Sequence, residues 1–297
     1  MPSLIDLRRR IKSVRNTQQV TKAMKTVATA KFKKASRTVA EGRPLWHAAP
    51  ESVGRLAGWA GPEVHPLLSV RGERTIHVLV VTTDKGLCGA FNSNLLAKTV
   101  DFLKTKESCA RIRLVLIGKK AAHFFHRLPY PVDRSFADHA DKIAAGDLAG
   151  LARDLMDRFQ SWETDAVYLA YNEFKSILAP KITITRILPV VPGEIAALTA
   201  GAAEGWPAAA GTAPDWEPGA PALIAFLLPR YVRSQIVHAV AESRAAEQAA
   251  RMMAMDSASN NAEDLIDALT LSLNKARQAG ITKELLEIIT AVDALKT

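Results

Sequence analysis

The chain of 297 residues has only two cysteines, Cys88 and Cys109. So few cysteines argue against a disulfide framework and against a structural zinc site. The sequence also lacks an 18-residue stretch free of charge, which a membrane-spanning helix would need. Its start has no apolar core of a secretory signal. We therefore expect reduced thiols and a chain that works in the cytosol.

Complete phosphate-binding motifs are lacking as well. Residues 84–89 (Asp-Lys-Gly-Leu-Cys-Gly) follow an expected strand and precede an expected helix, where α/β domains often bind phosphate. However, no phosphate loop is present, and the first glycine of the dinucleotide pattern is missing. A tight turn that needs glycine is the simpler interpretation, with nucleotide binding as the alternative.

Metal and nucleophile signals are equally sparse. His123 and His126 have a spacing that suits a metal pair, but no nearby carboxylate or cysteine completes the set. Lys85 could lower the pKa of the Cys88 thiol, yet a catalytic thiol needs a positioned base and none is identifiable. We therefore predict no catalytic residue, no cofactor site and no metal site, and a chain that is not an enzyme.

Long helical patterns occupy both ends of the chain. Leu4, Leu7, Ile11 and Val14 have heptad spacing, and after the polar residues 16–19 the apolar stripe resumes at Val20 in what reads as a slipped register. Residues 223–295 repeat the helical pattern. We predict a long antiparallel coiled coil of N- and C-terminal helices, with the C-terminal helix extending beyond its partner.

Apolar runs alternate with helical stretches in the middle of the chain. Residues 76–82, 112–117 and 166–171 read as buried strands, and residues 182–187 alternate like an edge strand. Strand and helix in alternation predict a Rossmann-like α/β domain. We expect four regions: an N-terminal coiled-coil helix (1–58), the α/β domain (59–192), a flexible linker rich in Ala, Gly and Pro (193–221), and a C-terminal coiled-coil helix (222–297).

Positive charge is concentrated at the N-terminus. The chain carries a net charge of +9, and residues 1–50 hold twelve Lys and Arg against Asp6 and Glu41. Such a basic helix indicates an acidic partner: a nucleic acid, an anionic membrane or an acidic protein surface. A basic coiled-coil nucleic-acid-binding protein is one reading, although Phe32 is the only aromatic residue before Trp46, which leaves no platform for base stacking.

Four segments of the sequence carry a family signature. The most specific is C-terminal and comprises Ser243, Glu247, Arg251, Met252, Ala254, Met255, Ala258, Ser259, Asn261 and Ala262, and it continues through 273–284 and 287–289. The others are residues 10–25 near the N-terminus, 84–92 at the start of the α/β domain and 228–235 at the entry into the last helix. Together these segments resemble the gamma subunit of F-type ATP synthase in its bacterial type.

Some features depart from that family. The linker 193–221 is long and rich in alanine, and Thr290 and Ala291 stand where the family usually carries glycine. A stiffer helix end is expected from this replacement, because glycine disfavours helix. The cysteine-bearing insertion of the chloroplast type is missing, so thiol regulation is not expected.

The resemblance implies a rotor shaft that couples rotation of a membrane c-ring to ATP synthesis or hydrolysis. Its implied partners are the alpha and beta subunits, the epsilon subunit and the c-ring, with no nucleic acid, at the cytoplasmic face of the bacterial membrane. No active site would lie on this chain. The implied contact residues are Arg8, Arg9, Arg10, Lys12, Met24, Lys25, Arg251, Met252, Met255, Arg277, Gln278, Thr282, Glu287, Ile288 and Leu295.

Overall fold

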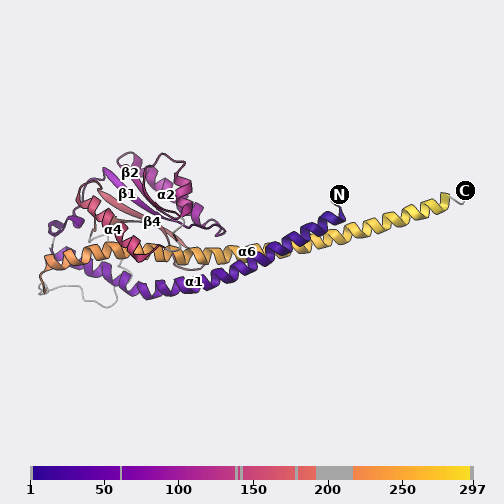
Figure 1. The fold of residues 1–297 in the computed structure, drawn as a ribbon, viewed down its shortest axis with the longest axis horizontal. Helices are drawn as coiled ribbons and strands as arrows, with labels where there is room; N and C mark the ends of the chain where they lie inside the picture. Colours follow the sequence, from indigo (N-terminus) through magenta and orange to yellow (C-terminus); the bar gives the residue numbers. More distant parts are fainter. Residues whose placement is uncertain are drawn as a thin grey trace. The chain divides into compact units, whose positions relative to one another are not determined.

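The structure is a computed structural model that describes residues 3–60, 62–137, 140, 143–177, 180–191 and 217–294. The chain divides into two compact units: Met1–Ala30 with Arg251–Thr297, here called the terminal helix pair, and Lys31–Ala250, here called the sheet unit. Two long helices, α1 (Leu4–Ala60) and α6 (Ala220–Ala294), contribute to both units (Figure 1). Most of the predicted linker, residues 193–216, lies outside the described residues.

Helix α1 begins with a side-chain cap. The Ser3 hydroxyl accepts a hydrogen bond from the Asp6 amide at 3.1 Å and donates one to the Asp6 carboxylate at 2.8 Å. This arrangement satisfies an amide that would otherwise lack a partner, and it places a negative charge at the positive end of the helix dipole. The sequence Ser3-Leu-Ile-Asp6 thus sets where the helix starts.

The sheet unit is built on five strands in the order β3-β2-β1-β4-β5. Strands β1 to β4 run parallel to one another, and β5 pairs antiparallel with β4 at one edge. Among the described residues, the remaining elements of this unit between α1 and α6 are three α-helices and two 3-10 turns, which lie before and between the strands. The bounds are η1 (Pro62–Val64), η2 (Pro66–Leu68), β1 (Thr75–Val81), α2 (Phe91–Glu107), β2 (Arg111–Ile117), α3 (Lys119–Phe125), β3 (Val132–Phe136), α4 (Ala145–Gln160), β4 (Ala166–Glu173) and β5 (Lys181–Leu188).

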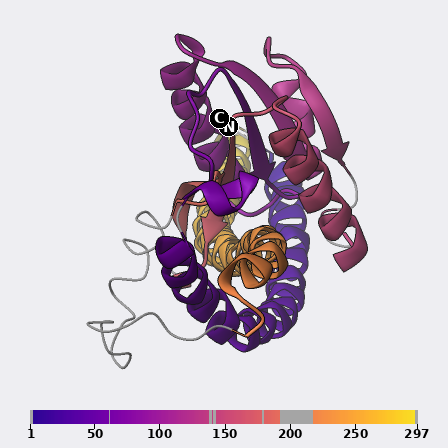
Figure 2. The same ribbon diagram turned by 90° about the vertical axis from the view of Figure 1, so that its left-hand side faces the viewer.

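Both faces of the sheet are covered. Alternate residues of β1 point to opposite faces, so Val78 packs with Leu95 of α2 and Phe125 of α3, whereas Leu79 packs with α4 and with α6. Ile236 is one of the α6 residues in that second core. The end-on view in Figure 2 shows the first part of α6 (orange) beside the sheet and near the later part of α1. A doubly wound arrangement results, and the predicted α/β class with long terminal helices is confirmed.

Some local predictions differ from the structure. The sequence pattern missed β3, because its residues are mostly exposed and include charged side chains instead of an apolar run. The sequence pattern predicts a helix over residues 140–162, whereas α4 spans Ala145–Gln160. The last helix begins at Ala220. Cys88 is buried and Cys109 is exposed, and both are free thiols.

Candidate functional site

The N-terminal part of α1 has one face that is buried or half-buried throughout. The spacing along this face is alternately three and four residues, so it is an unbroken heptad seam. It begins at Leu4 and ends at Ala28, which is 1% exposed. Its members are Leu4, Leu7, Ile11, Val14, Gln18, Thr21, Lys25 and Ala28.

The expectation of a slipped register after Val14 was wrong. Val20 and Val27 are 58% and 56% exposed, so they lie outside the seam, and Thr21 takes the buried place at 8% exposed. The heptad continues through polar residues where the sequence pattern had followed the nearest apolar ones. The continuous heptad could have been found from spacing alone. Positions 18, 21, 25 and 28 continue the three-four spacing of positions 4, 7, 11 and 14 without a break.

A matching seam runs along α6. It also follows the heptad spacing and changes from buried to half-buried towards the C-terminus. The residues are Met252, Met255, Ser259, Ala262, Ile266, Leu269, Leu273, Ala276 and Gly280. Beyond Gly280, residues 281–290 are exposed on every side. The predicted overhang of the last helix therefore agrees with the end of the paired face.

The centre of the terminal helix pair is joined by polar side chains. Lys25 Nζ lies 2.6 Å from Asp256 Oδ1, and the hydroxyls of Thr21 and Ser259 are 2.7 Å apart. One turn further, the Gln18 amide donates to Glu263 at 3.3 Å. Residue numbers rise on α1 as they fall on α6, so the helices are antiparallel. A slip by one heptad would place Lys25 opposite Ala249 or Glu263, and Thr21 opposite Met252 or Ile266, so the polar seam favours one register.

This polar seam gives a direct test of register. Thr21→Val should lower the free energy of unfolding by about 1 kcal/mol, since it removes one partner of a buried hydroxyl pair. The double variant Thr21→Val with Ser259→Ala should lose no more than the single variant, because both polar groups are then gone. Urea unfolding of the full chain, followed by circular dichroism, measures both. Additive losses would show that the hydroxyls act independently.

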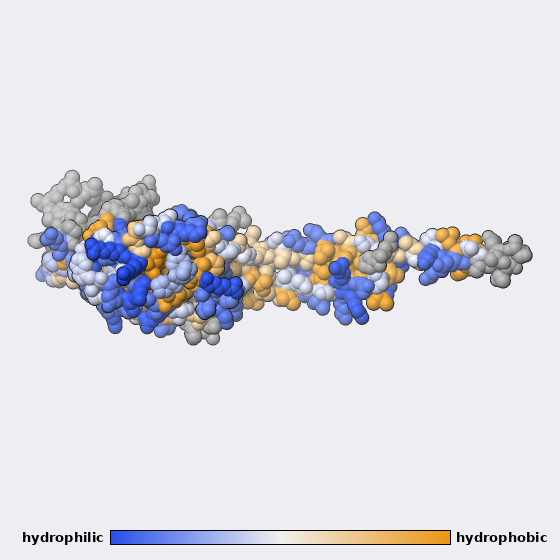
Figure 3. All heavy atoms as spheres, turned by 90° about the horizontal axis from the view of Figure 1, so that it is seen from above, coloured by the Kyte–Doolittle hydropathy of each residue, from blue (hydrophilic) through white to orange (hydrophobic). Residues whose placement is uncertain are grey.

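Most of the predicted contact residues are exposed on the terminal helix pair. Ile288 is 60% exposed, and the Glu287 carboxylate lies 3.7 Å from Lys283. The other exposed members are Arg8, Arg9, Arg10, Lys12, Arg277, Gln278 and Thr282. On the face shown in Figure 3, hydrophilic and hydrophobic side chains alternate along the helices.

The remaining predicted residues belong to the packed part of the helices. Arg251 and Met255 are 7% and 5% exposed, and Met24 and Met252 are half-buried. Lys25 is half-buried and bound to Asp256. Leu295 lies outside the described residues. The structure therefore places the buried and half-buried contact residues in or beside the seam. The exposed contact residues remain accessible to other molecules.

Helix α6 fills the place where doubly wound domains usually bind ligands. That place is the carboxyl edge of the sheet, where the strand order reverses beside β1. Here Arg244 of α6 donates to the Ala140 carbonyl at 2.7 Å, and Ser243 donates to the Val81 carbonyl at 3.5 Å. The cavity between these residues measures about 10 Å³, roughly the space of one water molecule. A nucleotide does not fit there.

The turn at residues 84–89 has a structural role. The Asp84 carboxylate accepts hydrogen bonds from the Lys119 amide at 2.9 Å and from the Ala140 amide at 2.8 Å. It thereby caps α3 and fixes a neighbouring loop. Leu87 and Gly89 have positive φ angles of 62° and 59°, as a tight turn requires. The tight-turn interpretation explains these residues without a ligand.

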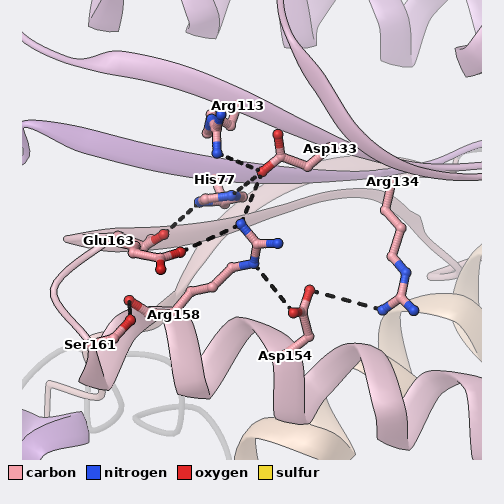
Figure 4. Close-up of polar contacts among 9 residues, drawn as sticks. His77, Arg113, Asp133, Arg134, Asp154, Arg158, Ser161 and Glu163 are labelled. Atoms are coloured by element: carbon pink, nitrogen blue, oxygen red, sulfur yellow. Dashed lines mark hydrogen bonds and ion pairs between the residues drawn. The ribbon is translucent and has the colours of Figure 1, made fainter.

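A polar network centred on a buried histidine lies at the amino-terminal ends of the parallel strands (Figure 4). His77 of β1 is 1% exposed, and its ring lies between the Thr164 hydroxyl at 2.7 Å and Asp133 Oδ2 at 2.9 Å. The same oxygen accepts hydrogen bonds from Arg113 at 3.3 Å and Arg158 at 3.4 Å. Burial lowers the pKa of His77 despite the raising influence of Asp133, so the ring is neutral and donates from Nε2.

These features define a protein with an antiparallel pair of long helices and a doubly wound domain whose usual ligand crevice is filled by α6. The family model described as ATP synthase matches residues 3–295. The ATP synthase gamma chain of Desulforudis audaxviator is 43% identical over 298 residues, and that of Pelotomaculum thermopropionicum is 40% identical over 296, each over 100% of both chains. The chain belongs to the ATP synthase gamma-chain family and is its non-catalytic shaft subunit.

Solved structures give the same fold. A central-stalk and c-ring structure of Tetrahymena thermophila mitochondrial ATP synthase contains a chain that is 25% identical, with a TM-score of 0.60 over 81% of this chain and 99% of that one. A chain of the Euglena gracilis mitochondrial enzyme reaches a TM-score of 0.66 at 20% identity, over 98% and 94%. The comparisons do not support the nucleic-acid-binding alternative.

Proposed function

We propose that this chain turns within a hexamer of alpha and beta subunits and couples that rotation to a membrane c-ring. The observation that carries the proposal is the family match over residues 3–295, together with the two exposed regions of the terminal helix pair. The titles of the structural relatives name F1, the central stalk and the c-ring as parts of their complexes. The epsilon subunit would dock with the sheet unit beside the ring.

The exposed regions suit two kinds of contact. The basic residues of the first two turns would face acidic surfaces of the beta subunits, which attract them over several ångströms without requiring a fixed geometry. The exposed apolar side chains near the C-terminus, among them Leu285 and Ile288, would turn inside an apolar sleeve. Different faces of the shaft would then bias each beta subunit towards a different state.

The proposed location is the cytoplasmic face of the bacterial membrane, where the chain would be held through its complex and would serve proton-driven ATP synthesis. Within the described residues, no helix combines the length and apolar character that crossing a bilayer requires.

Reconstitution tests this function. The purified chain is added to alpha and beta subunits, and the mass of the complex is measured together with its ATPase rate. One copy per three alpha and three beta subunits with a stimulated rate is the expected result, because the shaft would order the sites of the hexamer. An inert hexamer and no complex would overturn the proposal.

The same assay tests the basic residues. Changing Arg9, Arg10 and Lys12 together to Gln should raise the concentration needed for half-maximal stimulation by about tenfold at low salt, if each charge contributes about 0.5 kcal/mol. The difference should shrink at high salt, because screening weakens surface charge pairs. Lys33, Lys34 and Arg37, which are exposed on the same helix, provide a control triple variant. Equal losses from both triples would reject a specific basic contact.

A further inference from the structure

A buried carboxylate joins three elements of the sheet unit. Glu242 of α6 has a side chain that is 2% exposed. Its Oε1 accepts a hydrogen bond from Arg43 Nε of α1 at 3.3 Å, and its Oε2 accepts one from the Phe174 amide at 2.9 Å. Phe174 directly follows β4. One side chain thus contacts both long helices and the end of a central strand.

Arg43 closes this arrangement into a ring of contacts. Its Nη2 donates to the Phe174 carbonyl at 2.7 Å while its Nε donates to Glu242. The backbone of Phe174 is therefore held by a cation at its carbonyl and by an anion at its amide. Charged partners make such hydrogen bonds shorter and stronger than neutral ones. The planar guanidinium has the fork geometry that two acceptors at fixed angles require. We call Arg43, Phe174 and Glu242 the three-element junction.

Aromatic rings surround the three-element junction. Trp46 lies 4.6 Å from the His238 ring, and Tyr171 lies 6.2 Å from it, measured between ring centroids. Phe32 packs edge-on against Phe174 at 5.3 Å. His238 itself lies 3.3 Å from Glu242 Oε1. The Glu242 side chain is 2% exposed whereas that of Arg43 is 41% exposed, so the carboxylate is shielded from water and the guanidinium is partly solvated. Electrostatic contacts are stronger where water is excluded.

Glu242 nevertheless stays ionised. Burial by itself would raise its pKa, but the hydrogen bonds from His238 and the Phe174 amide and the charge of Arg43 hold the pKa of Glu242 below its usual value. Moving a charge out of water is unfavourable, and an apolar contact of similar volume would hold the elements together as well. Unlike an apolar contact, the charged hydrogen bonds depend on angle. They therefore fix the orientation of α1, α6 and the end of β4 as well as the distances between them.

We propose that Arg43 and Glu242 are positioning residues for torque transfer: the three-element junction fixes α1 to the sheet and to α6 so that this part of both helices turns with the α/β domain. The inference rests on the proposed rotor function. Helix α6 is already held by a large apolar core, with Leu228, Val232 and Ile236 almost fully buried. Helix α1 also enters apolar cores, through Val53, Leu56 and Ala57 and through Val39 and Trp46. The three-element junction therefore adds a directional contact to this apolar packing of α1.

The test measures the torsional stiffness of the assembled complex. A bead is attached at Cys109, which is an exposed thiol on the sheet unit, while Cys88 is buried and out of reach. With the alpha and beta hexamer fixed to a surface, the angular spread of the bead during pauses reports stiffness. Arg43→Met should increase the angular variance at least twofold, whereas Arg37→Met, an exposed arginine on the same helix, should not change it.

Hydrogen exchange of the isolated full chain gives a second test, which does not require the variant complex to assemble. In the full chain, Arg43→Met and Glu242→Ala should each speed hydrogen exchange of the Phe174 amide at least tenfold, and Glu41→Ala, at an exposed position of α1, should leave it unchanged. An unaltered angular variance in a correctly assembled Arg43→Met complex would overturn the inference, as would an unaltered exchange rate. A wild-type complex that does not assemble or rotate would instead refute the proposed function.

Discussion

Gly118→Ala should lower the free energy of unfolding by about 4 kcal/mol, the largest single effect that the backbone predicts. Gly118 has a φ of 96°, a conformation that costs a residue with a side chain about 1–3 kcal/mol. An added Cβ would also lie 2.5 Å from the Thr82 carbonyl oxygen, which belongs to the backbone and cannot rotate away. Overpacking of this kind costs a further ~1–3 kcal/mol.

The displacement would also reach α3. The Thr82 hydroxyl donates to the Ile117 carbonyl at 3.0 Å and accepts from the Ala121 amide at 2.9 Å, so a shift of Thr82 weakens the start of that helix. Gly146→Ala is the matched control, because no atom lies within 4 Å of an added Cβ there and alanine favours the helix. Urea unfolding of both full-length variants gives the comparison. Similar midpoints for the two would contradict the strain argument.

Asp133→Ala should destabilise the protein by about 3 kcal/mol. One oxygen of Asp133 accepts hydrogen bonds from His77, Arg113 and Arg158, and His77 is too deeply buried to find water instead. Hydrogen bonds to charged groups contribute about 1.5–3 kcal/mol, and the buried imidazole donor would be left without a partner.

Asp154→Ala provides the comparison for this charge network. Asp154 also contacts Arg158, at 3.3 Å, but its side chain is 37% exposed, so its removal should cost less than about 1 kcal/mol. The midpoints of urea unfolding for the two variants should therefore differ clearly. A loss at Asp133 as small as that at Asp154 would show that solvent replaces the network.

The parts of the fold that the sequence predicted are those with an unambiguous apolar pattern. Strands β1, β2 and β4 are largely buried and read as apolar runs. Strand β5 lies at the sheet edge as its alternating sequence predicted, although its burial does not alternate. Strand β3 has no such pattern, because its place in the sheet depends on pairing with β2 and not on its own burial. Its prediction would have required knowledge of the neighbouring strand.

The candidate contact residues also divide into those that the sequence pattern could predict and those that depend on tertiary contacts. The exposure of Arg9 and Arg10 follows from their place on an amphipathic helix, and the structure agrees. The pairing of Lys25 with Asp256 could not be read from composition, because it depends on the register of two helices more than 200 residues apart. The three-element junction was hidden for the same reason, since Glu242 looks like any helical glutamate until Phe174 and Arg43 are brought to it.

The polar seam has a consequence for biosynthesis. Its three contacts join residues that are 231, 238 and 245 positions apart in the chain. At a synthesis rate of roughly 5–20 residues per second, the first helix therefore leaves the ribosome about 10–50 seconds before its partner exists. During that interval Leu7 and Ile11, which are buried in the folded chain, have no helix to pack against. The polar contacts of the terminal helix pair can thus all form only after residue 263 has been synthesised, whereas the last strand of the sheet ends at Leu188.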